Sequence, residues 1–439
     1  MTQTMSAAPT TASATKTGAW FVTVLLALFM LINYADKAVL GLAGKNILKD
    51  LGITAQQFGV IQSAFFWLFF AGAILLGMLS AKIGLRWLLA VLMLVWVGTM
   101  VPLLGTVSFT VLMLCRLTLG FAEGPAYALA NHAACSRFPA DKRGLPLGIV
   151  SAGASLGPVL TAPVLTWVIV RWSWHAAFAV LAVAGMIWAV LWLVFGKDTP
   201  AESAAARGAE PEAVEVPLTA LIKSGTLIGV ALLMFFGYWS TTLKVAWLPL
   251  YLSDGLGYST LATGRLVMIP YAVAAIGSIS AGALSTRLLA KGVSRRVARG
   301  YLTGVLVLAS GIAMCGFTLV GRGMLQMVLI TLAFSLNTAS YAVAVTAVAD
   351  VVHPRKRGTV MGGLVAVSSI AGVISPLVLG YFVGHAANKV AGYSQGFALV
   401  GVLIAVGSVF ATFMVHPERD LAKLRARVQD SARVQECAR

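Results

Sequence analysis

Charged residues are scarce in this chain. Of its 439 residues only 11% are charged and 15 are acidic, whereas 59% are hydrophobic and the mean hydropathy is +0.89. A soluble globular domain carries about 25% charged residues, so the composition excludes that class. It indicates a polytopic membrane protein whose partner is the lipid bilayer.

Recognisable catalytic and metal-binding patterns are also missing. The four cysteines show neither a disulfide framework nor metal-ligand spacing; they are Cys115, Cys135, Cys315 and Cys437. The sequence contains no Walker-type phosphate loop, no cluster of metal ligands and no catalytic triad. We therefore expect a protein that is not an enzyme and has no metal or cofactor.

Twelve long apolar stretches account for most of the chain. Most are long enough to cross roughly 30 Å of hydrocarbon at about 1.5 Å per residue, which predicts an all-α protein with twelve transmembrane helices. The stretches are Trp20–Leu42, Gln57–Ala81, Trp87–Leu104, Phe109–Cys135, Gly144–Val170, Ala176–Gly196, Leu227–Leu252, Ser259–Leu289, Tyr301–Val320, Met324–Ala349, Gly358–Gly384 and Phe397–Val415.

The net charge of +17 could suggest a nucleic-acid partner, but the positions of the basic residues argue otherwise. Of the 32 Lys and Arg, 23 lie in the tails and in the loops on the N-terminal side of the membrane. The positive-inside rule then predicts an inner-membrane protein with both termini in the cytoplasm, and no binding of nucleic acid. Five lie on the opposite side (Lys45, Lys49, Arg171, Arg322, Lys389) and four within segments (Lys37, Arg116, Lys244, Arg265).

Internal similarity divides the chain into two halves. Phe138–Gly144 before the fifth segment is echoed by His353–Gly358 before the eleventh, and Gly77–Lys82 by Gly282–Arg287. We expect two six-helix bundles joined by a polar cytoplasmic linker. The expected divisions are a tail at 1–17, a bundle at 18–196, the linker at 197–220, a second bundle at 221–415 and a tail at 416–439.

Two apolar segments contain charges that lipid would not tolerate. Asp36 and Lys37 lie in the first, and Arg116 and Glu123 in the fourth. An ionisable group at the bilayer centre costs at least roughly 2.5–3.5 kcal/mol, so such groups usually face a protein interior and mark a solute path. Arg116 and Glu123 are seven residues apart and share a helix face, whereas Asp36 and Lys37 point about 100° apart.

These four charged residues can be interpreted in two ways. In the functional interpretation, Arg116 holds an organic anion or restrains the acid, and Glu123 binds and releases a proton; Asp36 is the second proton site. A substrate anion would compete for the cations, so proton affinity would depend on substrate occupancy. The alternative is a static buried ion pair between Arg116 and Glu123 that fixes helix packing.

Other intramembrane residues have equally open roles. Lys244 either binds the anion from the second half, bridging to Lys37 or Arg116, or snorkels to the interface. His132 either takes part in proton exit or is structural, and Arg265 is interfacial. The remaining polar or aromatic residues that could line the substrate cavity, for each of which packing is the alternative, are Tyr34, Gln62, Trp67, Tyr238, Trp247, Tyr271, Asn337 and Tyr341.

Several motifs resemble the major facilitator superfamily, and most closely its anion:cation symporter branch. They are Asn33–Lys37, Arg116–Gly124 and Trp247–Leu252. The resemblance implies the two-bundle fold, a substrate site between the bundles, and a small organic anion moved together with protons. We expect the carrier to be a monomer.

Five positions depart from that family pattern. Ala81 and Thr286 stand where a gating Asp is usual, so the gate must be altered. Lys37 replaces an Arg and therefore offers a point charge instead of a bidentate fork. Phe69 lacks a frequent Tyr hydroxyl, and Ser369, a further substrate-site candidate, replaces a common Asn.

Together these features predict a secondary active transporter that imports an organic carboxylate by proton symport with alternating access. Two alternatives stay open. One is proton-coupled efflux of an amphipathic compound, and the other is a transporter-like sensor without net flux. The intramembrane cations favour anion binding over the first, and the short tails and linker argue against the second.

Overall fold

The computed structural model describes residues 16–80, 83–138, 142–196, 221–352, 354–424 and 426. Across these ranges the regular elements are helices and there is no strand, which confirms the all-α prediction. The expected N-terminal tail, apart from its last two residues, lies outside the described residues. So do the whole linker at 197–220, the gate position Ala81 and most of the C-terminal tail.

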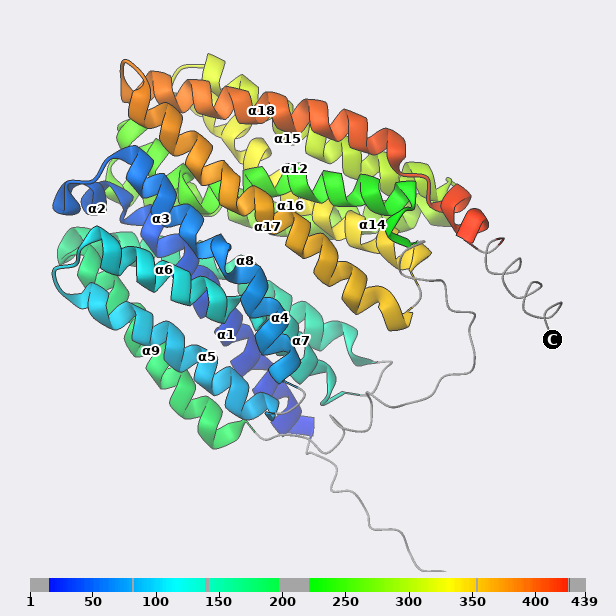
Figure 1. Cartoon of the computed structure of the whole chain (residues 1–439), viewed down its shortest axis with the longest axis horizontal. Coiled ribbons are helices and arrows are strands. Elements are labelled where there is room, and N and C mark those ends of the chain that lie inside the picture. The colour runs from blue at the N-terminus through cyan, green and yellow to red at the C-terminus, as the bar shows by residue number, and fades with distance from the viewer. Residues whose placement is uncertain are drawn as a thin grey trace, which may run out of the picture.

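The first half of the chain forms a bundle of helices with short connections (Figure 1). Its elements are α1 (Lys16–Leu42), α2 (Gly44–Leu51), α3 (Ala55–Trp67), α4 (Phe69–Leu79), α5 (Leu85–Met100), η1 (Val101–Leu104), α6 (Phe109–Glu123), α7 (Ala126–Cys135), α8 (Gly144–Arg171) and α9 (Trp174–Phe195).

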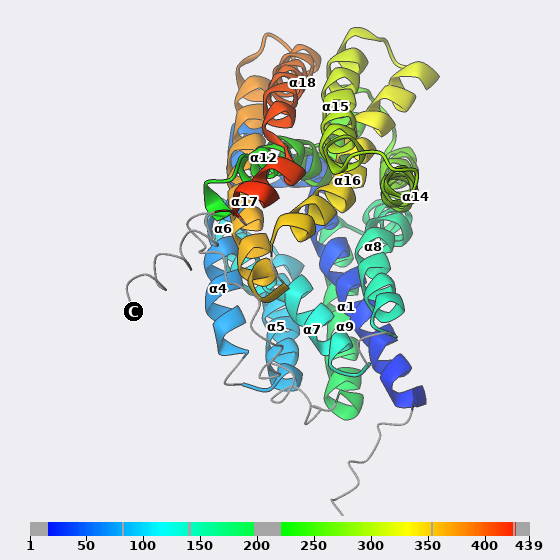
Figure 2. The same cartoon turned by 90° about the vertical axis from the view of Figure 1, so that its right-hand side faces the viewer.

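The second half forms a bundle of the same kind. Its elements are α12 (Gly225–Ala246), α13 (Leu248–Leu250), the π-helix η4 (Tyr251–Gly255), α14 (Thr260–Ala290), the π-helix η5 (Arg296–Tyr301), α15 (Leu302–Leu319), α16 (Met324–Val351), α17 (Pro354–His385) and α18 (Lys389–Met414). The bundles lie against each other, with α14 packed on α8 and α17 on α3 (Figure 2).

Eleven helices in the described chain are long and apolar enough to cross a membrane. The fourth expected segment, Phe109–Cys135, is instead divided into α6 and α7 at Gly124 and Pro125. Proline has no backbone N–H to donate and its ring clashes with the preceding turn, so it interrupts a helix at this point. The acidic residue Glu123 is the last residue of α6, directly beside this interruption.

Glycines bring the second and fourth helical segments into direct backbone contact. A Cβ at Gly120 of α6 would overlap the Phe65 carbonyl of α3, and one at Gly72 of α4 would overlap the Phe121 carbonyl of α6. At Gly124 a Cβ would meet the backbone of Phe69 and Ala73. Small residues at an interface let helices approach closely in lipid, and here they bring α3 and α4 against the charged residues of α6.

The two halves meet closely at the end of the bundles where α2 lies. Gln62 Nε2 donates to the Ala246 carbonyl at 3.1 Å, and Ser63 Oγ donates to the Val373 carbonyl at 2.7 Å. A Cβ at Gly59 would lie 2.6 Å from the Pro376 carbonyl oxygen. At Gly59 the interface therefore has no room for a side chain.

The residues after α18 return to the second bundle. Asp420 is buried, and its Oδ2 accepts from the backbone N–H of Thr226 at 2.6 Å and from its hydroxyl at 2.7 Å. Glu418 accepts from the backbone N–H of Arg295 at 2.6 Å. Asp420 thus satisfies free donors at the start of α12, as a capping residue does, and residues 416–424 belong to the second bundle.

Candidate functional site

The acidic and basic residues of α1 and α6 form one buried group. Asn33 and Lys37 are one helical turn apart on α1, and Lys37 Nζ donates to Asn33 Oδ1 at 2.7 Å. The same ammonium group lies 2.8 Å from Glu123 Oε2. The Glu123 side chain is completely buried, while 17% of the Lys37 side chain remains exposed. Lys37, and not Arg116, is therefore the direct partner of Glu123.

Arg116 contacts the aromatic ring of Phe65, which also lies near Lys37. Its guanidinium carbon is 4.8 Å from the ring centre of Phe65, and Lys37 Nζ is 5.7 Å from the same ring. Arg116 is buried, and in the described part of the chain it makes no direct ion pair with a carboxylate. It is a cation held on an aromatic face, with hydrogen-bonding capacity left for a ligand.

Asp36 is an acid without a direct partner. It is 1% exposed, and its Oδ2 has no hydrogen bond in the structure. The charged groups that act on it electrostatically are Glu123, Arg116 and Lys37. Two buried carboxylates therefore share two cations, an arrangement in which binding a proton or an anion at one place changes the balance at the others.

Lys244 of α12 supplies the buried cation of the second half. It is 3% exposed, and its ammonium donates to the Phe334 carbonyl and to the Thr338 hydroxyl of α16, each at 3.0 Å. It also lies 4.6 Å from the ring centre of Tyr271. Lys244 points into the second bundle, so the structure does not show the snorkelling alternative.

Tyrosines connect the two groups of charges. Lys37 Nζ lies 4.5 Å from the ring centre of Tyr34, and Tyr34 is within electrostatic range of Tyr271, Tyr238 and Tyr341 in the second half. Each half therefore places a lysine beside a tyrosine ring, and Tyr34 of the first half interacts electrostatically with Tyr271, Tyr238 and Tyr341 of the second.

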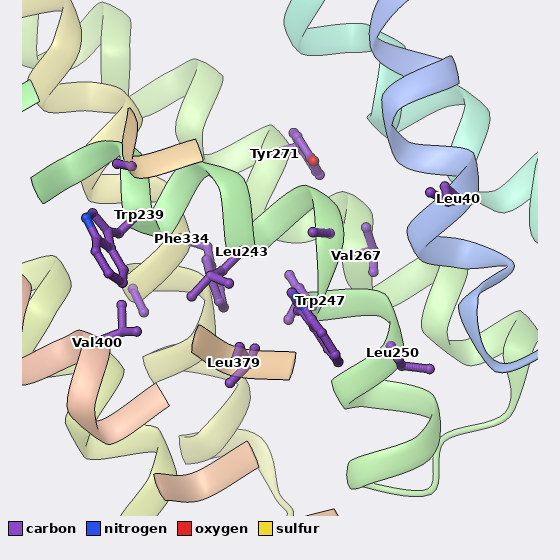
Figure 3. Packing of buried hydrophobic residues seen from close by; sticks show 14 of the residues in the cluster. Leu40, Trp239, Leu243, Trp247, Leu250, Val267, Tyr271, Phe334, Leu379 and Val400 are labelled. Carbon is purple, nitrogen blue, oxygen red and sulfur yellow. The ribbon is translucent and has the colours of Figure 1, made fainter. Parts of the chain in front are cut away.

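Three of the expected substrate residues make packing or backbone contacts. Trp247 is completely buried among apolar side chains that include Leu243, Leu250 and Leu379 (Figure 3). Ser369 donates to the Val365 carbonyl of its own helix at 2.9 Å. Gln62 joins the halves, as described above. These contacts support the packing alternative for all three.

The other expected residues are placed differently. Asn337 is buried in α16 and donates to Thr241 Oγ1 of α12 at 2.7 Å. Tyr341 is 40% exposed, and His132 is exposed near the end of α7. Arg265 is exposed, as expected for an interfacial residue. Of these four residues, Tyr341 interacts electrostatically with Tyr34 of the first half, whereas the bond of Asn337 stays within the second bundle.

Several residues of the site were not predicted from the sequence. Asn33 could have been found, because it precedes Lys37 by four residues on the same helix face. Phe65 could not, since nothing distinguishes it from the neighbouring phenylalanines. Tyr127, whose hydroxyl lies 2.9 Å from Ser151 Oγ, is within electrostatic range of Tyr34. No group of His, Cys, Asp or Glu among the described residues could hold a metal ion.

Charges of both signs buried within bundles of membrane-length helices are typical of a polytopic membrane transporter, and comparison with known proteins gives its family. The Major Facilitator Superfamily profile matches residues 26–339, and the chain belongs to this superfamily. It is not an enzyme.

Curated relatives align over nearly the whole chain. A hexuronate transporter of Bacillus subtilis is 30% identical over 409 residues, covering 90% of this chain and 94% of the relative. A probable sulfoacetate transporter of Cupriavidus necator is 27% identical, covering 89% and 92%. A probable galactarate/D-glucarate transporter of Escherichia coli is 29% identical, covering 88% and 94%.

Solved structures share the fold. A bacterial homolog of the human lysosomal transporter Spinster superimposes with a TM-score of 0.76 at 18% identity, covering 94% of this chain and 99% of that one. A D-xylose–proton symporter superimposes with a TM-score of 0.73 at 15% identity, covering 91% and 99%. The expected two-bundle fold is therefore confirmed.

Proposed function

We propose that this protein imports an organic carboxylate, of the sugar-acid class, by proton symport with alternating access. The observation that best supports this is the buried group of Lys37, Glu123, Asp36 and Arg116. Burying two acids and two cations in a protein interior is costly. A set of this kind is suited to binding anions and protons.

The geometry suggests how the two ligands would be coupled. Lys37 Nζ forms an ion pair with Glu123 Oε2 at 2.8 Å. A proton on Glu123 would remove that acid's charge and leave Lys37 free to bind a substrate carboxylate. Conversely, a bound carboxylate would compete with Glu123 for Lys37 and favour protonation of the acid. Proton and anion would then enter and leave together.

The relatives' names support the substrate class. Hexuronate, galactarate, D-glucarate and sulfoacetate are all small oxygen-rich anions, and each is named for a relative that aligns along nearly the full chain. The tyrosines near Lys37 could donate hydrogen bonds to substrate hydroxyls. From the charge distribution given above, we further propose an inner-membrane location with both termini in the cytoplasm. We also propose that the protein acts as a monomer.

The decisive test is Glu123→Gln in proteoliposomes with an imposed pH gradient, acidic outside. This variant keeps the side-chain shape but cannot carry a proton. We expect labelled hexuronate or galactarate to exchange across the membrane at a rate near that of the wild type, while accumulation up a gradient is lost. Uphill accumulation by Glu123→Gln would overturn the proton assignment.

Asp254→Asn is the matched control. Asp254 forms an ion pair with Lys389, whose side chain is 62% exposed, and surface pairs of this kind contribute about 0–1 kcal/mol. Accumulation by this variant should match the wild type. Proton-driven loss of substrate from loaded vesicles would identify efflux instead, and binding without flux would identify a sensor.

A further inference from the structure

The neutral surroundings of Lys244 are the feature that the proposed function leaves unexplained. Its ammonium group is bonded to a backbone carbonyl and a hydroxyl, and no carboxylate of the described chain forms an ion pair with it. Lys37 and Arg116, by contrast, lie near the two acids of their own half. Lys244 is therefore a buried lysine of the second half for whose ammonium form the described chain supplies no counter-charge.

A purely structural role does not account for a lysine here. The acceptors at Phe334 and Thr338 could be satisfied by a neutral donor, without removing an ammonium ion from water. Burying a cation without a counter-charge is costly. A charge retained in such a place is best explained by an anionic ligand that supplies the missing partner.

The surroundings of Lys244 contain further groups that suit an anion. Tyr271 is 6% exposed, and its hydroxyl is buried without a hydrogen-bond partner. The Thr338 hydroxyl accepts from Lys244 and keeps its own proton to donate. Lys244, Thr338 and Tyr271 together provide one positive charge and two O–H donors.

This group faces the first charged group through the tyrosines. Tyr271 is next to Lys244, Tyr34 is next to Lys37, and the two tyrosines interact electrostatically. Each half therefore places a lysine beside a tyrosine that interacts with the tyrosine of the other half, an arrangement suited to an extended molecule with an anionic group at each end.

We propose that Lys244, Thr338 and Tyr271 form a second anion subsite, so that the carrier selects substrates with an anionic group at each end over otherwise equal monoanions. This inference rests on the proposed function and narrows its substrate class to dianions such as dicarboxylates.

The test compares galactarate with D-galactonate, two linear six-carbon acids that differ only in whether carbon 6 is a carboxylate or a hydroxymethyl group. Dissociation constants are measured on the purified full-length protein at pH 7 by isothermal titration calorimetry. We expect the wild type to bind galactarate at least about tenfold more tightly, since one desolvated charge pair suffices for that ratio.

Substitutions in the subsite should remove this preference. In Lys244→Gln, the affinity for galactarate should fall by tenfold or more. The ratio of the galactarate affinity to the galactonate affinity should then fall toward one. Lys244→Arg, which keeps the charge, should retain a ratio above one. Tyr271→Phe removes only a hydroxyl and should lower the ratio by about two- to fivefold, which tests the subsite even if Lys244→Gln fails to fold.

Arg265→Gln is the matched control, because Arg265 is an exposed cation of the same half; its ratio should equal that of the wild type. Equal affinities for the two acids in the wild type would overturn the inference while leaving carboxylate transport in place. A ratio that Lys244→Gln does not change would do the same. Binding of neither acid would overturn the proposed function and the inference with it.

Discussion

The two cations of the first half, Lys37 and Arg116, both lie near Phe65 but have different environments. Lys37 has an acid and an amide as direct partners, whereas Arg116 has the ring face and no carboxylate in contact. A guanidinium is planar and can bind a carboxylate through two parallel N–H groups, which an ammonium cannot. Arg116 is therefore the better candidate for holding the substrate carboxylate, and Lys37 for linking it to the proton site.

Arg116→Ala should abolish this contact. We expect substrate affinity to fall at least about 30-fold, because truncating one partner of a buried charge pair costs roughly 2 kcal/mol or more. Arg116→Lys should lose less, since it keeps the charge but not the fork. Competition binding with a labelled sugar acid measures both variants. Wild-type affinity in Arg116→Ala would show that the guanidinium serves only packing.

The charged residues could be predicted from the sequence because their burial is costly and so indicates a function. Which of these charged residues form ion pairs with each other could not be predicted. Seven-residue spacing puts Arg116 and Glu123 on one face, yet Glu123 is the last residue of α6 and bonds to Lys37 of α1 instead. Which side chains meet across helices depends on rotation and depth of each helix, and these are set by packing that a single sequence does not reveal.

The helices show the same division between what the sequence predicts and what it does not. Long apolar stretches identified the spans, because lipid requires them. The helix boundaries were predicted less accurately. α18 begins at Lys389, capped by Asn388, and not at Phe397. The prediction missed its first turns because they contain glycine, serine and glutamine and do not read as an apolar stretch. The division of the fourth segment follows from Pro125, a local signal that hydropathy ignores.

Close packing of α6 on α3 depends on Gly120. A Cβ there would overlap the Phe65 carbonyl, so Gly120→Ala must push the two helices apart. We expect destabilisation of about 1–3 kcal/mol, seen as a lower melting temperature in detergent, together with weaker substrate binding because Phe65 moves.

Gly98→Ala is the control for this prediction. Gly98 lies within α5, and a Cβ at this position would meet nothing within 4 Å. Alanine is the better helix former by about 1 kcal/mol, so this variant should melt at the same or a higher temperature. Equal melting behaviour of Gly120→Ala and Gly98→Ala would contradict the importance of the α3–α6 contact.

The two-bundle arrangement could be predicted because the halves repeat each other in sequence. Which end of the interface is closed could not be predicted. In a carrier with alternating access, one sequence adopts both the arrangement open to one side and the arrangement open to the other. The structure has dense contacts between the halves near α2, where Gln62 and Ser63 bond across the interface. Tyr341, which interacts electrostatically with Tyr34 of the other half, remains 40% exposed.

Gly59→Val should disfavour this arrangement of the halves. The valine side chain would overlap the Pro376 carbonyl oxygen, because even a Cβ at position 59 would lie 2.6 Å from that oxygen. If closing at one end accompanies opening at the other, the variant should protect position 341. The measurement is the rate at which a thiol reagent labels Tyr341→Cys in a background without the native cysteines. We expect labelling to slow by about fivefold or more, because a shift of roughly 1 kcal/mol changes populations by that factor.

Gly77→Val tests whether added bulk alone has this effect. A Cβ at Gly77 of α4 would meet nothing within 4 Å, so labelling of position 341 should proceed as in the parent. Substrate should change the rate in the parent and in Gly77→Val alike, since a ligand shifts the equilibrium only through its different affinities for the two arrangements. If Gly59→Val labels at the parent's rate while remaining folded, contacts near α2 do not control access at the opposite end, and the halves do not rock as coupled rigid bodies.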